Sequence, residues 1–158
     1  MNMRFLVVAV FALACSDDVR ASWLDYSLKN LRSSQTESLL AYAQQPVAVV
    51  FFEPRCRWCL KQMRVLEALS EQCRVQPMAI GLNGSVRDLR EVLGRSGTVF
   101  PAFMASSRLL ADIGGVPATP ITVVIADGAQ TKAVRGFRSA DDLRPLLPQA
   151  SCSGDSAD

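Results

Sequence analysis

The sequence predicts an α/β domain in which a mixed central sheet is covered by helices on both faces. A continuous apolar and β-branched run at residues 47–52 is typical of a strand that is buried on both faces. An amphipathic segment and a second strand follow it, which is the order of a parallel β-α-β crossover. A later apolar strand, followed by an Asp-Gly turn, indicates an antiparallel hairpin, and this makes the sheet mixed.

Length and composition fit one such domain and exclude several functions. The chain has 158 residues, 49% of them hydrophobic and 20% charged, which suffices for the core of a single domain. The net charge is +2 and the basic residues are scattered, so nothing indicates nucleic acid as a partner. The chain has no histidine, which excludes Cys-His and Ser-His catalysis and His-ligated metals. Nucleophilic chemistry must therefore come from cysteine or from an unaided hydroxyl.

Residues 1–21 have the pattern of a signal peptide. Arg4 precedes an apolar run at residues 5–14 that is too short to cross a bilayer but suits a signal-peptide core. A Val-x-Ala box predicts cleavage after Ala21, so we expect a soluble periplasmic protein. The competing interpretation is a lipoprotein signal at Cys15, but a bulky leucine makes its box the poorer match.

The mature chain divides into an N-terminal lead, one domain and a tail. The lead, residues 22–34, is expected to form a short helix that docks on the domain. The domain covers residues 35–150 and begins with a helical pattern at 36–45. The tail, residues 151–158, is polar and is expected to be mobile.

The elements after the first strand follow from periodicity, turns and caps. In chain order we expect a helix over 56–73, a strand over 75–82, a helix from the cap Ser85 to 93, a loop over 94–101, a helix carrying Phe103 and residues 109–113, a strand over 121–126, its hairpin partner over 131–136, and a last helix after Ser139. Ser139 and Asp142 resemble a capping box. Pro145 lies deep in that last helix, so we expect the helix to be short or kinked.

The candidate catalytic site is Cys56-Arg57-Trp58-Cys59, which opens the helix after the buried strand. Unpaired N–H groups and the helix dipole favour a thiolate at a helix N-terminus, so we expect a low pKa for Cys56. Arg55 and Arg57 bracket Cys56 and act in the same direction. Cys59 lies nearly one turn further on, where it can resolve a mixed disulfide formed at Cys56. This redox-active pair requires no cofactor.

Three other interpretations of the cysteines compete with this one. A purely structural disulfide between Cys56 and Cys59 would close a very small loop and would constrain the unfolded chain little. A zinc site would need Cys73 and Cys152, whose spacing is not that of a zinc ribbon or knuckle, so we expect no metal. Two unpaired core cysteines do not suit an oxidising compartment. Cys73 and Cys152 either form a structural disulfide or leave Cys152 free on the tail.

A second element stands directly before the strand at 121–126, where the sequence reads Val-Pro-Ala-Thr-Pro. Together with the segment FFEPRCRWC and a later Val-Arg-Gly, it resembles the thioredoxin superfamily over residues 35–148. The resemblance implies a thioredoxin-like fold in which Pro120 is the cis-proline. It also implies that Thr119 and Ala118 belong to the loop that offers its backbone to an extended substrate. The alternative is an ordinary rigid proline loop.

Within this superfamily the chain is most similar to the thioredoxin-like disulfide isomerases of F-type conjugative transfer systems. The shared features are Val-Val-Phe-Phe before the site, Leu-Asn-Gly after the second strand, and Ala-Thr-Pro before the third. The chain departs from many members at Val50, where they carry an acid that accepts the proton of the buried thiol. Glu53 is the nearest substitute; the alternative is that Glu53 is an ordinary solvated surface residue.

The expected function is that of a periplasmic thiol-disulfide oxidoreductase, an isomerase or a reductase. Its partners would be disulfide-containing secreted or envelope proteins, including those of a conjugation apparatus, and a membrane or periplasmic redox partner. No dimerisation domain fits in the chain, so we expect a monomer. The alternatives are a TlpA-like reductant dedicated to cytochrome maturation, or a non-catalytic binding module or copper chaperone.

Overall fold

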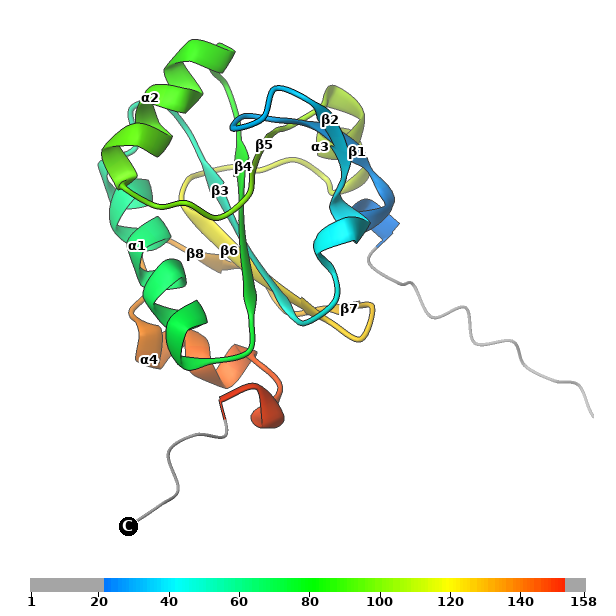
Figure 1. Ribbon diagram of the computed structural model, residues 1–158, viewed down its shortest axis with the longest axis vertical. Coiled ribbons are helices and arrows are strands. Elements are labelled where there is room, and N and C mark those ends of the chain that lie inside the picture. Colours follow the sequence, from blue (N-terminus) through cyan, green and yellow to red (C-terminus); the bar gives the residue numbers. More distant parts are fainter. Residues whose placement is uncertain (1–21, 153–158) are drawn as a thin grey trace, which may run out of the picture.

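The computed structural model describes residues 22–152, which form one mixed sheet flanked by helices (Figure 1). The strands are β1 (Ser27–Asn30), β2 (Thr36–Ser38), β3 (Val47–Phe52), β4 (Gln76–Gly81), β5 (Ala102–Met104), β6 (Ile121–Ala126), β7 (Ala129–Gln130) and β8 (Val134–Arg135). The helices are α1 (Arg57–Gln72), α2 (Val86–Ser96), α3 (Ser107–Asp112) and α4 (Ala140–Leu143). Four 3-10 turns accompany them, namely η1 (Ser22–Asp25), η2 (Leu39–Tyr42), η3 (Arg144–Leu146) and η4 (Gln149–Cys152).

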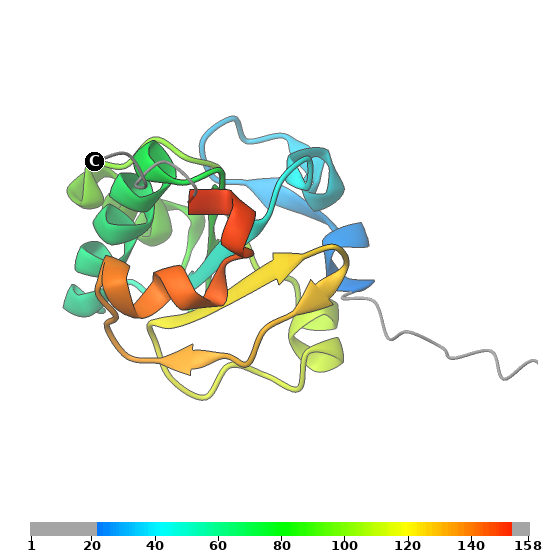
Figure 2. The same cartoon turned by 90° about the horizontal axis from the view of Figure 1, so that it is seen from below.

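The strand order is β2-β1-β5-β4-β3-β6-β7, and β8 also pairs with β6. β3, β4 and β5 are parallel neighbours, joined by crossovers that contain α1 and α2. β6 runs antiparallel to β3, which confirms the predicted mixed sheet. In Figure 2, the view from below, the orange and red turns η3 and η4 lie next to the yellow strand β6 on the near side of the molecule.

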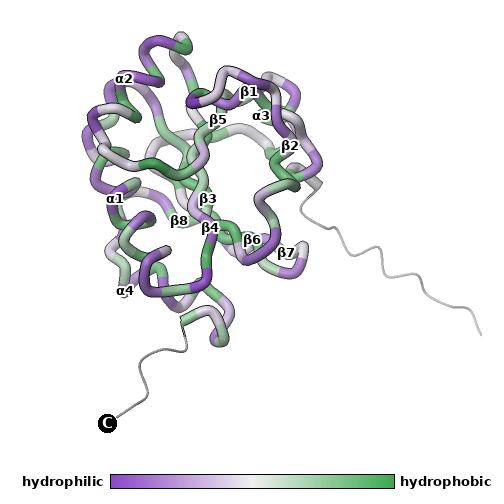
Figure 3. The backbone as a smooth tube through the Cα atoms, in the orientation of Figure 1, coloured by the Kyte–Doolittle hydropathy of each residue, from purple (hydrophilic) through white to green (hydrophobic). Residues whose placement is uncertain are grey.

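The central strand β3 is buried on both faces, as predicted. Its alternate residues face two different apolar clusters. Val50 and Phe52 pack on the side of α1, α2 and α4. Val49 and Phe51 pack on the other side, with α3 and the turns η1 and η2. Figure 3 shows hydrophobic residues along the inner strands and hydrophilic residues recurring along α1 and α2.

The helices predicted within residues 22–34 and at 36–45 are confirmed only as the short 3-10 turns η1 and η2. The remaining residues of these segments include β1 and β2, and β1 completes the sheet by pairing with β5. A strand of four residues is determined by its partner across the sheet more than by its own side chains. The lead nevertheless docks on the domain, because Trp23 and Leu24 are buried in the second cluster.

The segment between α2 and α3 also differs from the expectation. α2 continues through residues predicted as loop, up to Ser96, and ends at Gly97 in the left-handed conformation at φ +73°. Phe103 lies in β5 and not in the following helix. The apolar spacing of Phe103 with the α3 leucines is therefore coincidental, since the two residue sets belong to different elements.

The predicted hairpin partner of β6 is split into β7 and β8. The backbone N–H of Val124 donates to Thr131 Oγ1 at 3.0 Å, so a side chain replaces a strand carbonyl at this point of the ladder. After this interruption β8 pairs again with the start of β6. The turn at Asp127-Gly128 lies where it was predicted.

The C-terminal region confirms the short last helix. The Ser139 hydroxyl accepts from the Asp142 N–H, and the Asp142 carboxylate accepts from Ser139 in return. These hydrogen bonds lower the pKa of Asp142. The helix gives way to the 3-10 turn η3, which contains Pro145.

The mobile tail predicted from residue 151 is wrong for its first two residues. Ser151 is buried, its carbonyl accepts from the Arg74 N–H at 2.7 Å, and Cys152 completes η4. Residues 153–158 lie outside the described residues, as do the predicted signal peptide at 1–21 and Cys15. Within residues 22–152, no helix has both the length and the apolarity to cross a membrane.

Candidate active site

The structure joins Cys56 and Cys59 in a disulfide at the N-terminus of α1, with their Cα atoms 5.3 Å apart. β3 delivers the chain to this point, and a turn closes where the Cys56 N–H donates to the Glu53 carbonyl at 3.3 Å. Cys56 is the N-cap of α1, and its sulfur accepts a hydrogen bond from the Cys59 N–H at 3.1 Å. The sequence therefore places one sulfur directly on the unpaired donors of a helix terminus.

The two sulfurs differ in exposure. Cys59 is completely buried in the cluster beneath α1, whereas Cys56 is half-exposed at the surface. An incoming thiolate or disulfide can therefore reach Cys56 but not Cys59. The N–H groups and the positive dipole of a 16-residue helix would stabilise a thiolate formed at Cys56.

The Thr119–Pro120 peptide bond is cis, as the resemblance implied. Pro120 is buried at the start of β6, and its carbonyl accepts from the Gly136 N–H at 2.9 Å. Thr119 Oγ1 donates to Glu53 Oε1 at 3.4 Å. This bond ties the proline loop, including the exposed Ala118, to the turn that carries Cys56.

Val50 occupies the position where many superfamily members carry an acid, and its surroundings are apolar. Val50 is fully buried in the same cluster as Cys59. Glu53 lies outside this core and is half-buried, with Thr119 as its hydrogen-bond donor. Among the described residues around the disulfide, Glu53 is thus a carboxylate that the fold anchors beside the cysteine turn.

Trp58, which belongs to the predicted site, forms an aromatic pair with Phe137, a residue that sequence reasoning missed. Trp58 is 43% exposed and Phe137 is 38% exposed, and their ring centroids are 5.8 Å apart. The Lys61 ammonium lies 4.5 Å from the centre of the Trp58 ring, and the Arg57 guanidinium lies 5.4 Å from it. Phe137 is far away in the sequence, and no local pattern distinguishes it from an ordinary surface residue.

Gln62 explains why Phe137 lies there. Its buried amide accepts from the Arg138 N–H at 2.7 Å and donates to the Arg138 carbonyl at 3.2 Å. This two-bond contact holds the residue after Phe137 against α1. A glutamine in the interior of an apolar helix stripe was the available signal, since a buried amide needs partners.

The second disulfide joins Cys73 to Cys152 at the opposite end of α1. Cys73 is the C-cap of the helix, and a helix of this length separates it from Cys59 by about 20 Å. Of the two alternatives, the bridged one is therefore the state in the structure, and Cys152 is not free.

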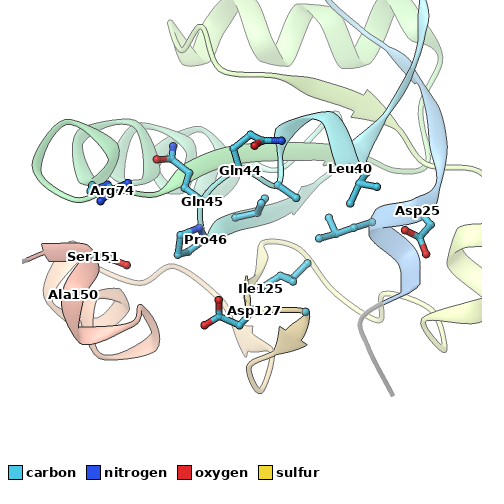
Figure 4. Close-up of a pocket in the computed structure, with 14 residues that line it drawn as sticks. Asp25, Leu40, Gln44, Gln45, Pro46, Arg74, Ile125, Asp127, Ala150 and Ser151 are labelled. Carbon is cyan, nitrogen blue, oxygen red and sulfur yellow. The ribbon is translucent and has the colours of Figure 1, made fainter. Parts of the chain in front are cut away.

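A hollow of about 610 Å³ lies away from both cysteines of the candidate site (Figure 4). Its lining comes from the chain before β3, the β6–β7 turn and the C-terminal residues, and includes Pro46, Asp127 and Ser151. Cys56 follows the far end of β3. This hollow therefore lies at the opposite end of β3 from Cys56 and takes no part in the cysteine chemistry.

The family comparison agrees with this geometry. Residues 25–145 match the family model of TraF, the F plasmid transfer operon protein. The chain belongs to the TraF family. No curated protein sequence matches it.

Solved structures share the fold of this TraF-family chain. A secreted Mycobacterium tuberculosis disulfide oxidoreductase, homologous to E. coli DsbE, superimposes with a TM-score of 0.67 at 20% identity, over 80% of this chain and 96% of that one. A DsbF homologue from Corynebacterium diphtheriae gives 0.63 at 22% identity, over 77% and 81%. StoA from Bacillus subtilis gives 0.60 at 15% identity, over 77% and 94%. The thioredoxin-like fold and the conjugation-family resemblance are thereby confirmed.

Proposed function

We propose that this TraF-family protein is a thiol-disulfide oxidoreductase of the cell envelope, acting as an isomerase or reductase on secreted or envelope proteins. The observation that carries the proposal is the pairing of an accessible sulfur, Cys56, with a buried sulfur, Cys59, in the first turn of one helix. A structural bridge gains nothing from such asymmetry. A catalytic pair needs it, because one sulfur must meet the client while the other waits beneath it.

The reaction begins with the reduced pair. The Cys56 thiolate attacks one sulfur of a client disulfide, and the other client sulfur leaves as a thiolate and takes up a proton. Cys59 then loses its proton and attacks the Cys56 sulfur, which releases the second client thiol and leaves the Cys56–Cys59 disulfide. Two electrons pass from the pair to the client. In isomerisation, a client thiol attacks the mixed disulfide instead and the pair stays reduced.

Neighbouring groups serve particular steps. Arg55 and Arg57 stabilise the Cys56 thiolate through their charge. Glu53 is the candidate acceptor for the Cys59 proton, since Val50 leaves no acid in the core. The backbone at Ala118 and Thr119 pairs with an extended client segment. Trp58 and Phe137 offer an apolar surface for a client side chain.

Cellular context supports the location and the clients. Residues 1–21 carry the signal-peptide pattern, the solved M. tuberculosis neighbour is secreted, and the family is that of an F plasmid transfer protein. We therefore place the protein in the periplasm, with disulfide-bonded components of a conjugation apparatus among its clients. A membrane or periplasmic redox partner regenerates the pair.

Insulin reduction and the reduction potential of the 56–59 pair test this function. Cys56→Ser should abolish the reduction of insulin by the protein in the presence of dithiothreitol. Full activity in that variant would refute the proposal. A potential on the order of −120 to −180 mV would identify an isomerase or oxidant, and one on the order of −270 mV a dedicated reductant. Stoichiometric copper binding lost with Cys56 and no insulin reduction would instead indicate a copper chaperone.

A further inference from the structure

A hollow of about 260 Å³ opens directly beside Cys56, on the side of α2. Its lining combines three arginines, the reactive cysteine and three apolar residues: Arg55, Arg57, Arg95, Cys56, Pro54, Leu60 and Val92. None of these residues is acidic. The hollow is smaller than a site for a drug-sized ligand and suits a single side chain.

The packing of α1 against α2 builds this hollow from distant segments. Arg64 Nε donates to the Ser96 carbonyl at 2.9 Å, and Arg64 Nη2 donates to the Arg95 carbonyl at 3.0 Å. These bonds fix the last turn of α2 against α1. Arg95 thereby lines the same hollow as Arg57 and Leu60 from the first turn of α1.

None of the three arginines of the hollow forms an ion pair among the described residues. Within residues 22–152, the ion pairs are Arg87 with Asp88 and Arg144 with Asp141, so none involves an arginine of the hollow. Arg57 lies over the Trp58 ring, a contact that orients the guanidinium without neutralising it.

A second hollow adjoins the first and limits the basic region. It shares Arg55 and Arg95 but is also lined by Glu53, Asp88 and Glu91, and it does not include Cys56. Arg55 and Arg95 thus stand between these carboxylates and the first hollow, whereas Arg57 lines only the hollow that contains the reactive sulfur.

We propose that the hollow is a subsite for the carboxylate of an aspartate or glutamate next to the client's cysteine, so that the protein prefers clients with acidic residues flanking the disulfide. The proposal rests on the proposed function, since it names the substrate class of the same site. Guanidinium groups present forked donors that match a carboxylate, and Leu60 and Val92 supply an apolar wall for its methylene groups. The occupant is an extended acidic segment of a client protein.

Short peptides activated as 2-pyridyl disulfides test the subsite. Each contains one cysteine flanked by aspartate, asparagine or lysine. The reduced protein's Cys56 thiolate attacks the peptide sulfur, the S–S bond between that sulfur and the pyridine-2-thiol sulfur breaks, and the leaving group takes up a proton as 2-thiopyridone. Its absorbance gives the second-order rate. Cys59 then displaces the peptide thiol, and the pair ends oxidised. The ratio of rates between peptides cancels any change in the intrinsic reactivity of Cys56.

We expect the aspartate peptide to react about fivefold faster than the asparagine peptide, which is the upper range for an exposed ion pair. The lysine peptide should be the slowest. Arg95→Glu should bring the ratio of the aspartate rate to the asparagine rate to about one or below. Arg95→Gln should give an intermediate ratio, and it keeps the test valid if Arg95→Glu does not fold. Arg74→Glu makes the same charge change at the far end of α1 and should keep the preference.

Two results would overturn the subsite. One is an equal rate for the aspartate and asparagine peptides with the native protein. The other is a full preference in both Arg95 variants, which would assign it to the general charge of the surface. If no peptide reacts faster with the native protein than with Cys56→Ser, the proposed function itself fails and the subsite fails with it.

Discussion

The two ends of α1 carry the two disulfides of the described chain, and they differ in almost every physical respect (Figure 1). At the N-terminus, Cys56 and Cys59 are three residues apart, and Cys56 is half-exposed. At the C-terminus, Cys73 is buried and bridges 79 residues to Cys152. One helix thus has a short-range, partly exposed disulfide at one end and, at the other, a bridge that joins it to the turn η4.

Helix polarity and loop length explain the difference. The positive helix terminus stabilises a thiolate, whereas the negative terminus disfavours one, so the reduced form gains support only at Cys56. Loop-closure entropy favours the other bridge, because a long closed loop restricts the unfolded chain far more than a short one. The same bond type therefore favours reactivity at one end of α1 and stability at the other.

The largest expected effect is on catalytic turnover, which should depend on the Cys56–Cys59 pair and not on the Cys73–Cys152 pair. Cys59→Ala should abolish multiple turnover, because Cys56 still attacks a client disulfide but no buried thiol releases the product. Mixed disulfides should accumulate and survive non-reducing electrophoresis, and mass spectrometry would identify the client. The double variant Cys73→Ala/Cys152→Ala should retain turnover. Equal adducts in a Cys56→Ala/Cys59→Ala control would show that the pair at the N-terminus is not the working site.

The second effect is on the free energy of unfolding, to which the Cys73–Cys152 bridge should contribute more than the Cys56–Cys59 bridge. Cys73→Ala/Cys152→Ala should lower the free energy of unfolding by about 4–5 kcal/mol, as expected for a closed loop of this length. Cys56→Ala/Cys59→Ala should cost about 2 kcal/mol by the same relation. Urea denaturation of the oxidised proteins measures both. The reverse order of the two costs would contradict the assignment of the structural role to the C-terminal bridge.

A smaller effect is expected from Gln62, which lies one turn into α1 from the active end. Gln62→Leu leaves the backbone groups of Arg138 without their partners, so the free energy of unfolding should fall by about 1–2 kcal/mol. Phe137 should also lose its fixed place beside Trp58, and Trp58 fluorescence of the folded variant would report this. Gln62→Glu keeps only the acceptor for the Arg138 N–H, and its free energy of unfolding should lie between those of the native protein and Gln62→Leu. An unchanged fluorescence would show that Phe137 is held by other contacts.

The smallest effect is expected from reversing the charge of an arginine at either end of α1. Arg57→Glu should raise the pKa of Cys56 by less than one unit and lower the reduction potential by about 20 mV, because exposed charges contribute up to about 1 kcal/mol. Thiolate absorbance and glutathione equilibration measure the two quantities. Arg74→Glu, at the other end of α1, should change neither. An identical shift in both variants would mean that net charge, and not the position of Arg57, sets the potential.

Local sequence features anticipated much of the active end. The run before Cys56 is apolar at every position because β3 is buried on both faces, and this pattern is visible without coordinates. The spacing of Cys56 and Cys59 with a helical stripe after them fixes the N-cap and the buried partner. The proline loop needed the superfamily resemblance, because the cis state of Pro120 has no local signature beyond the preceding threonine and the following strand.

Other features depend on contacts that no local pattern shows. β1 lies in the lead for which a short helix is predicted, and pairing with the open edge of β5 decides for a strand. The tail was expected to begin at residue 151 because its composition is polar, and the bridge from Cys152 to Cys73 orders it up to that point.

The sequence by itself determined where α1 begins and ends, which cysteine stands at its N-terminus with a second cysteine three residues on, and which strand lies at the centre. Each of these follows from interactions within one turn or one strand. Only the tertiary structure decided what surrounds the reactive sulfur: Arg95 from α2, Phe137 from the segment before α4, and Glu53 through its bond to Thr119. The physical reason is that these side chains are exposed or half-buried, so they carry no hydrophobic period. Their neighbours are set by the packing of elements far apart in the chain.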